Sequence, residues 1–104
     1  MSKSSLLILK QIIHNLENRP SFYLEKATYH HLAYFLSGYL CALSDIDKAS
    51  YNAELSKWVS NERSSLEWSN YILIVQAKND EHLAYKLLFE CIKKFINEKS
   101  CDTE

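Results

Sequence analysis

Apolar residues recur every three or four positions through most of the chain, which is the spacing of one face of an α-helix. The pattern is densest from Tyr29 to Leu43, where we predict the central helix of the fold. Its inner side is predicted to contain Leu32, Phe35, Leu36, Tyr39, Leu40 and Leu43, with Tyr34 and Ala42 widening it. Gly38, the only glycine, lies inside this helix. Because a mid-helix glycine costs about 1 kcal/mol relative to alanine, we expect a second backbone to approach closely there.

The segment before the central helix predicts a first helix from about Ser4 to Asn18. Pro20 ends it, because proline lacks an amide donor and its ring clashes with the preceding turn. Phe22 and Leu24 are expected to attach the connecting segment to the core. The inner positions of this first helix are Leu6, Leu9, Ile12, Ile13 and Leu16.

A third helix is predicted after the polar stretch Ser44–Asp47, with Asp47 as its N-cap. Its inner side would contain Tyr51, Leu55, Trp58 and Val59.

The fourth helix is predicted from Leu66 to Lys78. Ser64 and Glu67 have the spacing of a capping box at its start. The apolar run Tyr71–Val75 is also compatible with a buried strand, but the flanking helical patterns favour a helix. Its inner face would contain Trp68, Ile72 and Val75.

A fifth helix is predicted after Asn79, its N-cap, with Asp80 and Glu81 in the first turn. Residues 100–104 are expected to fray. The predicted fold is therefore all-α, a single helical domain over residues 1–104 with about five helices around Tyr29–Leu43. The inner stripe of the fifth helix is predicted to be Leu83, Leu87, Leu88, Cys91, Ile92, Phe95 and Ile96, with Ala84 at its edge.

The composition and charge of the chain argue against some classes of function. The chain has 104 residues, 47% of them hydrophobic, which suffices for one core without a metal or disulfides. Twelve basic and thirteen acidic side chains give a formal charge of −1. This balance argues against a dedicated nucleic-acid binder, which needs a basic face to neutralise phosphates.

The three cysteines indicate a reducing compartment. Cys41 and Cys91 lie among apolar residues and are expected to be buried thiols, whereas Cys101 lies in the polar tail. No pair has the spacing of zinc ligands. The sequence also contains no signal-peptide core and no membrane span, so we expect a cytoplasmic protein that does not bind membranes.

No arrangement of residues predicts catalysis or a bound cofactor. Side chains of His30 and His31 point about 100° apart on a helix, so a shared metal ion is not expected. Cys41 lies too far from His30 along the helix to be activated as a nucleophile. A single glycine cannot form a phosphate-binding loop.

Tyrosines and paired carboxylates are the features that suggest a partner. Tyr23, Tyr51 and Tyr85 are candidates for partial exposure, and tyrosine beside carboxylates suits a protein-binding surface. Tyrosines that only border the core, with hydroxyls in water, explain the composition equally well. The acidic pairs Asp45/Asp47 and Asp80/Glu81 likewise fit helix capping as well as partner binding.

An ordered set of aromatic and acidic residues runs through the chain: Tyr29, Phe35-Leu36-Ser37-Gly38-Tyr39, Trp58, Trp68, Asp80-Glu81-His82-Leu83-Ala84, Phe89 and Phe95. This set resembles the small helical immunity proteins of bacterial polymorphic toxin and contact-dependent growth inhibition systems. The resemblance covers Tyr29 to Phe95 and leaves out the first helix. It implies a non-enzymatic protein that binds one cognate toxin domain, often a nuclease, and occludes its active site.

Nuclease toxins tend to be basic around their substrate groove, so the inhibitor needs carboxylates on its contact face. We expect a monomer that binds the toxin domain 1:1, without nucleic acid as a partner. A helical regulator or antitoxin that binds DNA, and a homodimeric interaction module, are the alternatives. The predicted contact residues are Asp45, Asp47, Tyr51 and Glu54 in one cluster, and Asp80 and Glu81 in a second.

Overall fold

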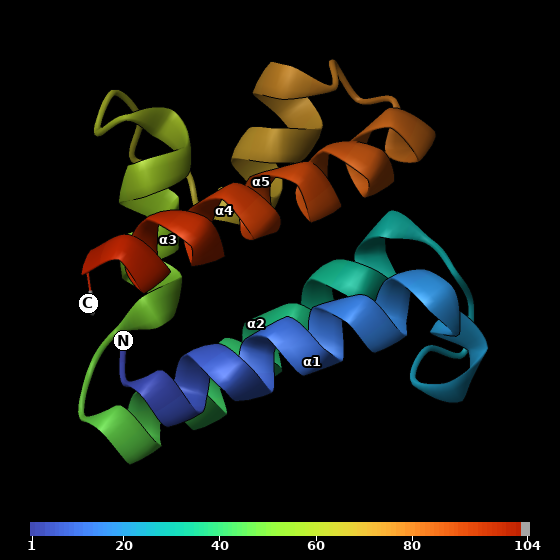
Figure 1. Ribbon diagram of the computed structural model, residues 1–104. Coiled ribbons are helices and arrows are strands. Elements are labelled where there is room, and N and C mark those ends of the chain that lie inside the picture. Colours follow the sequence, from blue (N-terminus) through green and yellow to red (C-terminus); the bar gives the residue numbers. More distant parts are fainter. Residues whose placement is uncertain (103–104) are drawn as a thin grey trace.

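A computed structural model describes residues 1–102 and shows an all-α fold, as predicted (Figure 1). No strand occurs within this range, so the run Tyr71–Val75 is helical. The elements in chain order are α1 (Lys3–Asn18), the 3₁₀ turn η1 (Pro20–Phe22), α2 (Tyr29–Asp47), α3 (Tyr51–Ser60), α4 (Trp68–Asn70), the π-helix η2 (Tyr71–Gln76) and α5 (Glu81–Asp102).

The long C-terminal helix α5 contacts α1, α2, α3 and η2. In Figure 1 it runs between α1 and α2 on one side and α3, α4 and η2 on the other. The helix α2 in turn contacts α3 and α5, so α2 and α5 together organise the bundle. α5 continues to Asp102, past the predicted start of fraying at residue 100, and Thr103 and Glu104 lie outside the described residues.

Most predicted inner positions of the helices are buried, since the apolar spacing places them on the side that faces the other helices. All five inner positions of the first helix are buried, as are Trp68 and Ile72. Leu83, predicted to lie in the inner stripe of α5, is instead exposed, whereas Ala84, predicted at the edge of that stripe, is fully buried. Phe22 is exposed too, whereas Leu24 is buried and attaches the connecting segment to the core as predicted.

Three predictions for α2 and its surroundings are wrong. Tyr34 and Ala42 face solvent and do not widen the inner side. Gly38 is exposed, and a Cβ atom added there would meet no atom within 4 Å, so no second backbone approaches it within the monomer. Cys41, expected to be a buried thiol, is also exposed.

The predicted helix caps differ from the observed ones. Asp47 belongs to the last turn of α2, and Ser50 is the residue before α3. Glu67 caps α4 by accepting from the amide of Ser69, so the predicted capping box does not form. Asp80, and not Asn79, accepts from the amide of Leu83 at the start of α5.

The fourth helical segment is a π-helix over most of its length, which was not predicted. The amide of Ala77 donates to the carbonyl of Ile72, five residues earlier, at 2.8 Å. In this wider turn the residue that next faces the core lies five positions later, and not three or four. Ala77 therefore follows Ile72 in the core, and Val75 is exposed. The predicted inward position of Val75 assumed the ordinary α-helical spacing and is wrong.

Candidate functional site

The side of α2 that faces solvent carries two large apolar side chains that the other helices leave uncovered. Its residues recur at the three-and-four spacing of one helix side. Two of them, Tyr34 and Ile46, are large apolar side chains that are 75% and 72% exposed. We define the α2 outer face as His30, Tyr34, Gly38, Cys41, Ala42, Asp45 and Ile46.

The α2 outer face is unusually poor in charge. The chain contains no lysine, arginine or glutamate between Lys26 and Lys48, so Asp45 is the only charged acidic or basic residue on this face. An exposed helix side in a soluble protein normally carries several charged residues along its length. Apolar and small side chains here instead present a strip that a partner can cover with little desolvation cost.

Aromatic rings border the α2 outer face along one edge. Phe35 and Tyr39 stack with ring centroids 5.7 Å apart, and Tyr23 meets Phe35 edge-on at 6.0 Å. Phe35 and Tyr39 are half-buried and pack against the core. These rings are therefore held in place by the fold, which makes them a preorganised border for a contact surface.

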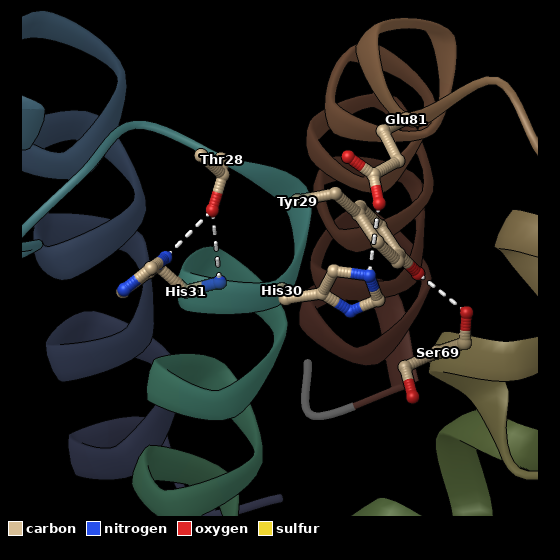
Figure 2. A network of polar contacts seen from close by, with 6 residues as sticks. All are labelled: Thr28, Tyr29, His30, His31, Ser69 and Glu81. Atoms are coloured by element: carbon tan, nitrogen blue, oxygen red, sulfur yellow. Dashed lines mark hydrogen bonds and ion pairs between the residues drawn. The ribbon is translucent and has the colours of Figure 1, made fainter.

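Polar contacts fix the N-terminal end of α2 (Figure 2). The Thr28 hydroxyl caps the helix by accepting from the amide of His31. The Nε2 atom of His30 lies 3.0 Å from a carboxylate oxygen of Glu81, at the start of α5. The buried Tyr29 donates its hydroxyl to the carbonyl of Ser69 at 2.6 Å, and desolvation by this burial raises the pKa of Tyr29. This end of α2 is therefore tied to both α4 and α5.

A second polar cluster fixes the C-terminal end of α2. The Tyr51 hydroxyl donates to the Asp47 carboxylate at 2.5 Å, and the Ser2 hydroxyl donates to it at 3.0 Å. These contacts join the end of α2 to α3 and to the start of α1. Burial, and then the contact with Asp47, raises the pKa of Tyr51.

The predicted contact residues fall into different environments. Tyr51 is only 3% exposed, so the expectation that it lies on the surface is wrong. The structure brings Asp47 and Tyr51 together, but they bond to each other within the fold, and the buried Tyr51 is not available to a partner. Glu54 pairs instead with Lys99 on α5, and Asp80 caps that helix. Asp45 lies on the α2 outer face near its C-terminal end. Glu81 contacts His30, which lies at the N-terminal end of the same face.

Sequence analysis missed Tyr34, Gly38, Ala42 and Ile46 as surface residues. Tyr34 and Ala42 were predicted to widen the inner side, Gly38 was expected to meet a second backbone, and Ile46 was placed in a polar stretch between helices. Only the placement of the neighbouring helices shows which side of α2 remains uncovered. The absence of lysine, arginine and glutamate over the whole helix was the one signal available in the sequence.

Other features of residues 1–102 offer less for chemistry. This part of the chain contains no cluster of three histidine, cysteine or acidic residues able to hold a metal ion. A depression of about 270 Å³ between α1 and α5 includes His14, but the Lys93–Glu17 ion pair, at 2.6 Å, lies across it. None of the described helices is both long enough and apolar enough to cross a bilayer.

Comparisons with protein-family models, with curated proteins and with solved structures find no match to this chain. The candidate site therefore rests on the geometry of the chain itself.

The internal role of Asp47 predicts a pH dependence of stability. Hydrogen bonds, first from the Tyr51 hydroxyl and then from serines of the N-terminal segment, lower the pKa of Asp47 from 3.8 to about 2. Because the folded state favours the charged carboxylate, this contribution is present above pH about 4 and is lost as pH falls towards about 2. We expect Asp47→Asn to flatten the decrease in unfolding free energy over this interval.

Denaturant unfolding monitored by circular dichroism between pH 2 and pH 5 checks this. Asp45→Asn is the matched control, because Asp45 is exposed and has no hydrogen-bond or ion-pair partner in the described part of the chain. If the free energy of unfolding fell equally steeply with pH in the wild-type and Asp47→Asn proteins, Asp47 would not be the group responsible.

Proposed function

We propose that this chain is a non-enzymatic protein-binding domain that contacts its partner through the α2 outer face. The observation that carries the proposal is a solvent-facing helix side that presents Tyr34 and Ile46 and only one charged acidic or basic residue. Large exposed apolar side chains bordered by fixed aromatic rings are characteristic of protein contact surfaces.

We further propose that the partner is a toxin domain and that the chain is its immunity protein. The resemblance of Tyr29–Phe95 to helical immunity proteins supports this, and so does the position of the carboxylates. Asp45 lies towards one end of the α2 outer face and Glu81 lies at the other. Two acidic groups that bracket an apolar strip suit a partner with basic groups around an active-site groove, as in a nuclease. Covering that groove would exclude the substrate without any chemistry by the inhibitor.

In this proposal the two kinds of residue have separate roles. The carboxylates accelerate the encounter with a basic partner, because long-range attraction acts mainly on the association rate. Tyr34 provides buried area at low entropic cost, since its side chain has few rotatable bonds, and acts on the dissociation rate. The proposal includes a cytoplasmic location and no cofactor, no enzymatic activity and no nucleic-acid partner.

The proposal predicts that the reading frame next to the one for this chain encodes a protein ending in a toxin domain. Binding kinetics with that domain are then measured by surface plasmon resonance. Asp45→Lys combined with Glu81→Lys should slow association by about tenfold at low salt. Tyr34→Ala should raise the dissociation rate by about tenfold or more, because it removes the most exposed aromatic side chain of the face.

Glu90→Lys is the matched control for charge, because Glu90 is exposed on α5 and lies outside the α2 outer face. Wild-type kinetics in both test variants would reject this contact face. Failure of the wild-type chain to bind or inhibit the toxin domain would reject the immunity function itself.

A further inference from the structure

We infer that, in the absence of another partner, the α2 outer face binds a second copy of this chain, with the two α2 helices antiparallel across a two-fold axis near Gly38. The inference concerns the pure chain and does not depend on the toxin proposal. A toxin that uses the same face would displace the second copy.

The shape of the face is self-complementary in this arrangement. An antiparallel pair centred on Gly38 brings Tyr34, four residues before the centre, opposite Ala42, four residues after it. The exposed ring of Tyr34 then covers a small side chain, and the two-fold axis repeats this contact. At the centre, the space outside Gly38 is open, so two backbones can approach closely.

This arrangement also explains why a glycine occupies the middle of α2. Nothing within the monomer requires Gly38, because an added Cβ atom would meet no neighbour there. Glycine nevertheless weakens the helix relative to alanine. A backbone from a second copy provides the close approach that the monomer lacks.

Charges along the two helices are complementary in the same register. Asp45, seven residues after Gly38, faces the turn that contains His31, seven residues before it. Lys48, exposed directly after α2, faces Thr28, where Glu81 and Glu25 contact His30 and His31. Lys48 of each copy therefore lies opposite carboxylates of the other copy, and the two-fold axis repeats this pairing.

A contact dominated by one pair of helices is smaller than an obligate interface, so we expect a dimer that dissociates on dilution. Sedimentation velocity of the purified chain from about 1 µM to about 1 mM should show a shift from monomer to dimer, as expected for a weak complex. Gly38→Arg should raise the dissociation constant by about a hundredfold or more, since it places two like charges at the axis.

Ala53→Arg is the matched control, because Ala53 is also a small exposed residue within a helix, on α3. It should dimerise like the wild type. Gly38→Ala tests the placement of the axis without adding charge: it should raise the melting temperature by several degrees, up to about 8 °C, and weaken the dimer. A Gly38→Ala dimer as strong as the wild type would overturn the placement of the axis at Gly38.

Native cysteines provide an independent readout. Cys41 lies on the α2 outer face, whereas the exposed Cys101 lies at the end of α5. Cys91 is half-buried, and desolvation raises the pKa of its thiol, so it should react slowly. At dimer-forming concentrations, alkylation of Cys41 should slow at least about fivefold relative to Cys101, since thiol reaction follows access. A chain that stays monomeric to the highest concentration, or a dimer that Gly38→Arg leaves intact, would overturn the inference.

Discussion

Truncation of Trp68 to alanine is expected to lower the free energy of unfolding by about 3–5 kcal/mol. Trp68 is among the largest fully buried side chains, and it joins the short helix α4 to α3. Its indole Nε1 donates to the Asn52 side chain at 2.9 Å, and its amide donates to the Ser56 hydroxyl at 2.8 Å. Removal of the indole creates a cavity and leaves the Asn52 oxygen without this donor.

The loss would be a large part of the total stability, which for a domain of this size is about 5–15 kcal/mol. Urea unfolding followed by circular dichroism measures it. Trp58→Ala is the control with the same change of residue, because Trp58 is only half-buried and bonds Glu98 at the surface. A smaller loss is expected there. If Trp68→Ala cost no more than Trp58→Ala, the indole would not be the anchor of α4.

Periodicity predicted the helical fold and most of the core, because burial requires apolar residues on one helix side whatever the topology. It could not predict how broad the buried side of α2 is. Tyr34, Ala42 and Ile46 are as apolar as the residues that are buried, and only the number of neighbouring helices determines which of them stay outside. Of the surface that we propose for binding, the sequence therefore predicted only Asp45 as a contact residue.

Local capping signals were less reliable than periodicity, since several polar residues in one loop can cap the same helix. Asp47 lies near the start of α3, as predicted, but α2 continues far enough to include it. Its carboxylate then meets Ser2 and Tyr51 from other elements. The same limit applies to Glu54: its partner Lys99 is distant in sequence, and nothing near Glu54 reveals the contact.

The π-helix after Trp68 also could not be predicted from spacing. A stretch of apolar residues such as Tyr71–Val75 fits an α-helix, a strand or a π-helix, because almost every position is apolar. The helical choice was correct, and the wider turn decided which residues face inward. Ile72 and Ala77 are buried five positions apart, so Ile74 and Val75 are exposed between them.

Asn52 is the residue whose role the sequence gives no reason to suspect, and its removal is the second large effect that we expect. Its Nδ2 donates to the carbonyl of Ser37 on α2 at 3.0 Å, while its Oδ1 accepts from Trp68. One amide thus joins α2, α3 and α4. Asn52→Ala should lower the free energy of unfolding by about 2–3 kcal/mol, because two hydrogen bonds are lost and the buried indole N–H has no acceptor.

The double variant Asn52→Ala with Trp68→Phe separates the contribution of the bond to Ser37 from that of the bond to Trp68. Once the indole N–H is absent, Asn52→Ala should cost only about 1 kcal/mol, the value of the remaining bond to Ser37. Urea unfolding of the four proteins in this cycle measures the coupling, with Asn97→Ala, an exposed position on α5, as the control for loss of an asparagine. Additive effects of Asn52→Ala and Trp68→Phe would contradict the assignment. The cost that remains once the indole is absent measures the bond from Asn52 to the Ser37 carbonyl, which joins α3 to α2 beside Gly38.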